Sequence, residues 1–129
     1  MNADELKKRY WEGQRDFVGV EMSDQRLDHL WLSEADLSYS TFVSARLSYS
    51  NLTNVNLEEA EIYFAYLNHT VLTGANLKGA NLSGSEMFFA DLTLAKLNKA
   101  KLEGAKLNGA NLTKADLTKA NLRWGICEG

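Results

Sequence analysis

The stretch Ala75-Asn76-Leu77-Lys78-Gly79-Ala80-Asn81-Leu82-Ser83-Gly84 contains two copies of one five-residue unit. A leucine-like residue recurs at every fifth position in both directions from this stretch, and the register never breaks between Phe17 and Leu122. The series comprises 22 consecutive units and covers most of the 129 residues. We call the leucine-like position the centre and number its neighbours minus two to plus two. A repeat of this regularity predicts a solenoid.

The five-residue period excludes both ordinary secondary structures. In an α-helix five residues turn about 500°, so the leucines would spread around the helix and share no face. In a continuous strand, side chains alternate with a period of two, so successive leucines would lie on opposite faces. We therefore expect the chain to turn once in every unit, which returns each leucine to the same interior.

The neighbours of the centre agree with a coil that turns every five residues. The minus-two position is small, most often alanine, and residues two apart on an extended segment point the same way. The minus-one position is mostly polar, and the two positions after the centre are rich in turn residues such as Ser, Thr, Asn, Gly and Lys. The unit is expected to contain three extended residues, two of them inward, followed by a two-residue corner.

The pattern Ala-(Asp/Asn)-Leu-x-x, as in Ala75 to Gly79 and Ala115 to Lys119, closely resembles the pentapeptide-repeat family. This resemblance implies an all-β fold, a right-handed quadrilateral parallel β-helix with four units per coil and therefore about 5.5 coils. At roughly 4.8 Å per layer such a solenoid would be about 26 Å long. The leader from Glu5 to Tyr10 is similar to that of many cyanobacterial members.

The ends of the chain divide it into three predicted parts, a cap at 1–16, the β-helix at 17–122 and a tail at 123–129. Residues 2–12 read as a short helix in which Asn2 is the N-cap and Gly13 the stop. We expect Leu6, Tyr10 and Trp11 to cover the first open coil. A regulatory or partner-binding helix is the alternative.

The C-terminal tail is too short for a second capping helix. The favoured expectation is that Trp124 and Ile126 fold over the last coil. Otherwise two open ends could stack and form an end-to-end homodimer through the C-terminal coil.

No constellation of residues predicts an enzyme, a metal site or a cofactor site. His29 and His69 share a repeat position but stand two layers apart, roughly 10 Å, with Tyr49 in the layer between them. Cys127 is the single cysteine and has no partner for an internal disulfide, and no long apolar run or signal core is present. We expect a cytoplasmic protein that is not inserted in a membrane.

Charge is distributed unevenly along the chain. Residues 1–65 carry 12 acids and 6 bases, whereas residues 66–129 carry 5 acids and 8 bases. The solenoid is therefore expected to be acidic at its start and basic toward its end, and direct binding of nucleic acid is not expected.

Aromatic residues gather at two corners in the middle of the repeat. Tyr63 and Phe64 occupy one corner and Phe88 and Phe89 another, while Tyr66 lies at an outward position between them. Residues twenty apart fall in one column, which aligns Tyr49, His69 and Phe89 in three successive layers. The candidate partner-binding patch consists of Tyr49, Tyr63, Phe64, Tyr66, His69, Phe88 and Phe89. A self-stacking ladder that stabilises the coils is the competing interpretation.

Three function classes follow. The first is a non-enzymatic scaffold that binds another protein of unknown identity, which the aromatic patch and the missing catalytic constellation favour. The second comes from the family resemblance, since some members resemble duplex DNA, bind type II topoisomerases and protect them from quinolones. The basic second half and the short rod argue against this mimicry. The third is a purely structural repeat protein.

Overall fold

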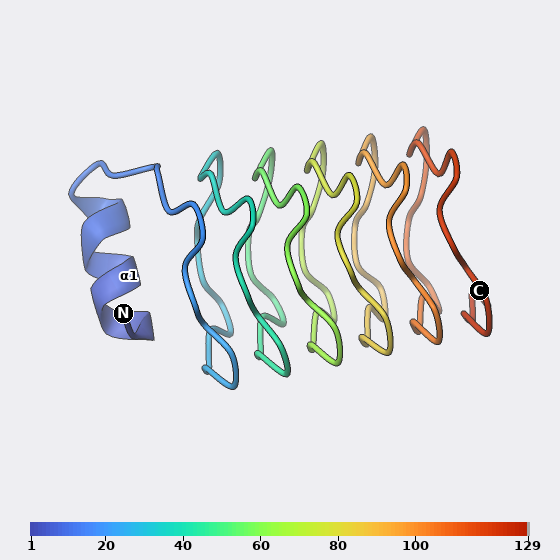
Figure 1. Ribbon diagram of the computed structural model, residues 1–129, viewed down its shortest axis with the longest axis horizontal. Helices are drawn as coiled ribbons and strands as arrows, with labels where there is room; N and C mark the ends of the chain where they lie inside the picture. Colours follow the sequence, from blue (N-terminus) through green and yellow to red (C-terminus); the bar gives the residue numbers. More distant parts are fainter. Residues whose placement is uncertain (129) are drawn as a thin grey trace.

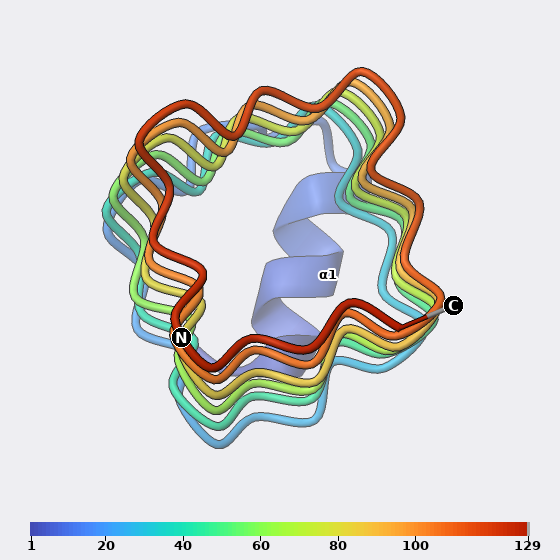
Figure 2. The ribbon, with the colours of Figure 1, turned by 90° about the vertical axis from the view of Figure 1, so that its right-hand side faces the viewer.

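The computed structural model describes residues 1–128 and consists of helix α1 (Ala3–Trp11) followed by a solenoid of stacked square coils (Figure 1). Every backbone bridge in the solenoid joins two residues twenty positions apart in the parallel sense, from Asp16↔Asp36 to Lys106↔Ile126. One coil therefore contains four units, and the end-on view shows the four sides of the square (Figure 2). Units that are four apart in the sequence therefore lie on the same side of successive coils.

The sides of the solenoid contain single bridging residues and no longer strands within residues 1–128. The predicted path is correct, but each side is shorter than the expected three-residue strand. A turn begins directly after every centre, which leaves one minus-one residue per unit in the parallel ladder. We number the sides in chain order from 1 to 4, and side 3 carries the centres Leu27, Leu47, Leu67, Met87 and Leu107.

The five amides of a unit are satisfied in a fixed way, as residues 55–59 illustrate. The amide of Asn56 donates to the preceding coil at Ala35, and the amides of Leu57 and Glu59 donate to the following coil. The amide of Val55 closes the turn by donating to the carbonyl of Leu52. The fifth amide, at plus one, donates to a side chain, as the amide of Glu58 donates to Oδ1 of Asn56.

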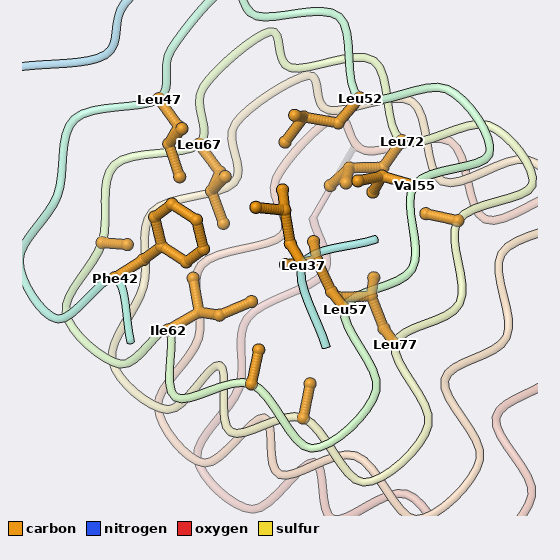
Figure 3. Close-up of a cluster of buried hydrophobic side chains, with 14 of the residues drawn as sticks. Leu37, Phe42, Leu47, Leu52, Val55, Leu57, Ile62, Leu67, Leu72 and Leu77 are labelled. Carbon is orange, nitrogen blue, oxygen red and sulfur yellow. The ribbon is translucent and has the colours of Figure 1, made fainter. Parts of the chain in front are cut away.

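The core is a column of inward centres and minus-two residues, as predicted. Figure 3 shows Leu37 from side 1, and Phe42 and Ile62 from successive coils of side 2, pointing into the same interior. The centres from Phe17 to Leu107 are at most 3% exposed. Burying one such side chain contributes about 1.5–3 kcal/mol, so the column is the main source of stability.

The corners adopt a backbone conformation that glycine favours. The plus-two residue has positive φ in every turn, including turns without glycine such as Tyr49 (61°), Phe64 (57°) and Phe89 (58°). A side chain in this region costs about 1–2 kcal/mol relative to glycine. Large aromatic residues at plus two therefore carry a conformational penalty that a glycine would avoid.

Helix α1 lies across the N-terminal end of the solenoid (Figures 1 and 2). The side chain of Asn2 accepts from the amide of Glu5 at 2.9 Å, which confirms the predicted N-cap. Leu6 and Tyr10 are buried, and the Tyr10 hydroxyl donates to the carbonyl of Ser33 at 3.0 Å. The prediction for Trp11 is wrong, because this side chain is 73% exposed and does not share the buried face of the helix.

The C-terminal residues continue the coil and do not cover it. Ile126 pairs with Lys106, so the ladder extends past Leu122. The predicted cover by Trp124 and Ile126 is wrong, since these residues occupy outward plus-two and minus-one positions and are 78% and 44% exposed. Inside this last coil, Leu117 is only partly buried. Helix α1, the one helix among residues 1–128, is too short to cross a membrane.

A candidate interaction face

The aspartates and asparagines at minus one have a specific task on sides 1, 2 and 4. In Asn76, for example, Oδ1 accepts a hydrogen bond from the amide of Lys78 at 3.1 Å. This bond satisfies the plus-one amide, which the ladder leaves free, and it explains why Asp or Asn precedes the centre so often. The same bond is formed by Asp16, Glu21, Asp36, Asn51, Asn56, Asn81, Asp91, Asn111, Asp116 and Asn121.

Side 3 satisfies the plus-one amides of Ser48, Asn68 and Phe88 differently. Its minus-one positions hold Arg26, Arg46, Tyr66, Glu86 and Lys106, and none of them is Asp or Asn. Here the plus-one side chain of one coil accepts the amide of the next coil. Asp28 accepts from Ser48 at 3.1 Å, Ser48 from Asn68 at 3.2 Å and Asn68 from Phe88 at 2.9 Å. The minus-one residues of side 3 therefore do not bind the plus-one amide of their own unit, whereas the Asp and Asn residues at minus one on the other sides do.

One corner of side 3 is lined by a stack of four aromatic rings. The ring centroids of His29 and Tyr49 are 5.3 Å apart, those of Tyr49 and His69 4.7 Å, and those of His69 and Phe89 5.2 Å. The ring planes differ by at most 19°. The predicted column of Tyr49, His69 and Phe89 is thus present, and His29 extends it by one coil.

The stack hides ring faces and leaves ring edges exposed. Tyr49 and Phe89 are 57% and 62% exposed although their neighbours cover them above or below. Phe89 also lies over Gly109, where an added Cβ would come within 2.5 Å of the ring. The self-stacking ladder and the binding surface are therefore compatible, since a partner would meet the edges of rings that the coils already hold in place.

The opposite corner of side 3 is formed by Tyr63 and Phe64. Their rings pack edge to face with centroids 5.8 Å apart. Phe64 is 60% exposed and leans over Gly84, while Tyr63 is half-buried. All seven predicted patch residues consequently border or lie on side 3.

A groove of about 370 Å³ lies on side 3 between its two columns of outward side chains. It is lined by Asp28, Arg46, Ser48, Tyr66 and Asn68. The guanidinium carbon of Arg46 is 5.9 Å from the ring centroid of Tyr66, a cation–π distance. Of these residues only Tyr66 was predicted as a site residue. The absence of Asp and Asn from every minus-one position of side 3 is the sequence signal that distinguishes this side.

The charged groups of the solenoid are mostly solvated. Of the two ion pairs within residues 1–128, Arg9 with Glu5 lies in α1 and Lys8 with Glu12 joins α1 to its C-cap residue. Hydrogen bonds from Ser23, Thr93 and Thr118 lower the pKa of Glu21, Asp91 and Asp116, and all three carboxylates serve the backbone of sides 1, 2 or 4. On side 3, Asp28 is the carboxylate that serves the backbone.

Within residues 1–128 no three His, Cys, Asp or Glu side chains are placed to hold a metal ion. His29 and His69 contact opposite faces of Tyr49. Cys127 is exposed near the C-terminal end. The interior contains a narrow void of about 10 Å³ lined by core centres, which is room for about one water molecule and for no larger ligand.

Comparison with known proteins identified matches at the level of family and fold. The family model described as pentapeptide repeats matches residues 32–62, 60–98 and 95–125, in 8 copies. No curated protein sequence matched the chain.

Three solved structures share the fold of this chain. Rfr23, a pentapeptide repeat protein from the cyanobacterium Cyanothece 51142, is 26% identical with a TM-score of 0.90, over 97% of this chain and 98% of that one. The pentapeptide repeat protein alr5209 from Nostoc PCC 7120 is 33% identical with a TM-score of 0.62, over 85% and 84% of the two chains. QnrB1, a plasmid-mediated fluoroquinolone resistance protein, is 16% identical with a TM-score of 0.53, over 81% and 61%, and shares the fold alone.

Proposed function

Because this chain belongs to the pentapeptide-repeat family, we propose that it is a non-enzymatic scaffold that binds another protein through side 3 of its solenoid. The family fold gives each coil the same interior, so recognition depends on outward and corner residues that depart from the repeat. Side 3 is the side where these departures are continuous from coil to coil.

The single observation that carries this proposal is the change of hydrogen bonding on side 3. There the plus-one side chains Asp28, Ser48 and Asn68 take over the backbone amides. This substitution leaves minus one open to Arg46 and Tyr66, which no structural requirement of the repeat selects. Aromatic and arginine side chains are also the residue types that dominate binding energy at protein interfaces.

The exposure of the patch agrees with such a role. Tyr66 is 40% exposed and is flanked by aromatic corners that include Phe64 and Phe89. Rings held by stacking or by glycine contacts lose little side-chain entropy when a partner binds them. A purely structural ladder would account for the stack, but not for Arg46 and Tyr66 in the groove beside it.

The test is affinity capture from a lysate of the source organism with the wild type and a Tyr66→Ala/Phe89→Ala variant. The matched control is Trp31→Ala/Tyr39→Ala, which removes a minus-one and a plus-two aromatic from sides 4 and 1 with similar exposure. We expect the control variant to capture the same partner as the wild type, and the Tyr66→Ala/Phe89→Ala variant to fail to capture it. A partner retained equally by both variants would exclude side 3 as its binding surface.

Topoisomerase binding by DNA mimicry is the alternative function, and the charge distribution weighs against it. A DNA mimic needs a continuous acidic surface, whereas residues 66–129 carry 8 bases against 5 acids. A gyrase supercoiling assay at micromolar protein separates the two functions. Inhibition of supercoiling or protection from a quinolone would favour mimicry over the scaffold.

We further propose that the C-terminal coil pairs with a second copy of itself. Within residues 1–128 the amides of Leu112, Leu117 and Leu122 have no backbone acceptor, and Leu122 is 38% exposed although it is a centre. Such an edge supports strand pairing with another edge. A cytoplasmic location suits the protein because its single cysteine forms no internal disulfide.

A further inference from the structure

Side 3 carries two arginines in neighbouring coils, Arg26 and Arg46. Arg26 and Arg46 are bridge partners in the ladder, so their side chains leave the same side one layer apart. Both are exposed, and within residues 1–128 neither forms an ion pair. Two like charges in this arrangement repel each other, so an anion between them would be favourable.

The surroundings make these arginines unusual. Between residues 16 and 77 they are the only Lys or Arg residues, whereas nine Asp or Glu residues occupy the same span. Of those nine acids Asp28 lies on side 3 and Asp24 borders it in the corner column of Phe64, whereas the other seven belong to sides 1, 2 and 4. The first coils therefore present one cationic side within an otherwise acidic surface.

The groove on side 3 places Arg46 next to groups that would complete an anion site. The Arg46 guanidinium lies over the Tyr66 ring, and the Asn68 side chain lines the same groove. The Asn68 amide nitrogen lies 3.4 Å from Glu86 Oε1, a long contact that a better acceptor could replace. Asp28 limits the groove on the side of the first coils and already accepts the Ser48 amide.

We propose that this groove binds an Asp or Glu side chain of the partner protein, with an apolar neighbour of that residue against Tyr66 and the ring edges of the stack. This inference rests on the proposed scaffold function and specifies the chemistry of the partner. Arginine binds carboxylates through two parallel hydrogen bonds, which gives the contact its direction. Nucleic acid does not fit, because the acidic sides next to side 3 would repel an extended polyanion.

A random peptide library displayed on phage is the probe that tests the proposal. Selection on the wild-type protein should enrich peptides with an Asp or Glu beside an aromatic or aliphatic residue. A selected peptide should lose about tenfold or more in affinity for Arg46→Gln, and about as much when its own acid is changed to the amide. Asp28→Asn keeps the backbone acceptor and removes a negative charge, so it should strengthen binding.

The control variant is Lys101→Gln, which removes one positive charge from the minus-one position of side 2 and should leave the affinity unchanged. Peptides without enrichment of acids, or equal affinity for Arg46→Gln and the wild type, would overturn the proposal. Inorganic phosphate or a short DNA duplex that displaces the peptide at lower concentration than the free peptide does would also overturn it. Loss of captured partner in Tyr66→Ala/Phe89→Ala together with acid-free peptides would remove this inference and leave the scaffold function intact.

Discussion

Oδ1 of Asp28 accepts a hydrogen bond from the amide of Ser48 in the next coil, with 3.1 Å between oxygen and nitrogen. On the other sides, wherever Asp or Asn stands at minus one, it accepts the equivalent amide of its own unit, as Asn76 does from Lys78. This change leaves the minus-one residues of side 3 without a bond to the plus-one amide of their own unit. We regard this row of residues, which includes Arg46 and Tyr66, as the functional surface.

The first prediction concerns this division of tasks. Asn81→Ala removes the acceptor for the Ser83 amide and should lower the free energy of unfolding by about 1 kcal/mol. Lys106→Ala, at minus one on side 3, removes no acceptor and should change it by less than about 0.5 kcal/mol. Urea unfolding followed by circular dichroism measures both. Equal losses for the two variants would mean that the side 3 residues are also structural.

The second prediction concerns the ring of Phe89 over Gly109. Gly104→Ala places a methyl group in open space at a φ of +69° and should cost about 1–2 kcal/mol of unfolding free energy. Gly109→Ala has a similar φ of +72° but also meets the Phe89 ring, so it should cost more. In a Phe89→Ala background the extra cost should vanish. A double-mutant cycle that gives no coupling between Gly109 and Phe89 would show that the ring does not rest there in solution.

The third prediction concerns pH. Hydrogen bonds from Thr93 lower the pKa of Asp91, so the folded state holds the ionised form more strongly than the unfolded state. This contribution is complete above the unfolded-state pKa of about 3.9 and is lost as the pH falls through the lower folded-state pKa. Asp91→Asn keeps an acceptor oxygen and does not titrate. Below about pH 4 the urea midpoint of the wild type should therefore fall more steeply with pH than that of Asp91→Asn. Parallel plots of midpoint against pH for the two proteins would contradict the lowered pKa of Asp91.

The fourth prediction concerns the C-terminal coil. Sedimentation equilibrium should show a concentration-dependent dimer for the wild type and a monomer for Leu122→Lys, which places a charge on the open core. Trp124→Lys, at a more exposed outward position, should still dimerise. A wild type that stays monomeric at all concentrations would remove the end-to-end pairing.

Much of the fold follows from the five-residue period alone. The period requires a coil, places Leu37, Phe42 and Ile62 in one core and aligns Tyr49, His69 and Phe89 in one column. The C-terminal end of the repeat was harder to predict. Gly125 and Cys127 differ from the usual Ala and Leu, but Ile126 still pairs with Lys106. Trp11 was misplaced because a nine-residue helix buries only one face, and Leu6 and Tyr10 already fill it.

The candidate site was only half visible in the sequence. Aromatic content and the twenty-residue offset were sufficient to predict that the aromatic residues gather around Tyr66; that they form a binding patch stays a prediction. The role of Arg46 required the structure, because the groove depends on which side chains serve the backbone and which remain free. The amino-acid composition does not distinguish Asp28 from Asp36. In the structure Asp28 accepts a backbone amide of the next coil, whereas Asp36 accepts a backbone amide of its own unit.

The most direct measurement is photo-crosslinking in cells of the source organism. A photoreactive phenylalanine analogue is placed at position 66, on side 3, and in a separate protein at position 31, the minus-one position of side 4 that holds Trp31. We predict that the analogue at position 66 forms a crosslink to one protein partner, and that the analogue at position 31 does not. Crosslinks to the same partner at equal yield from both positions, or none from position 66, would contradict the claim that side 3 is the binding surface.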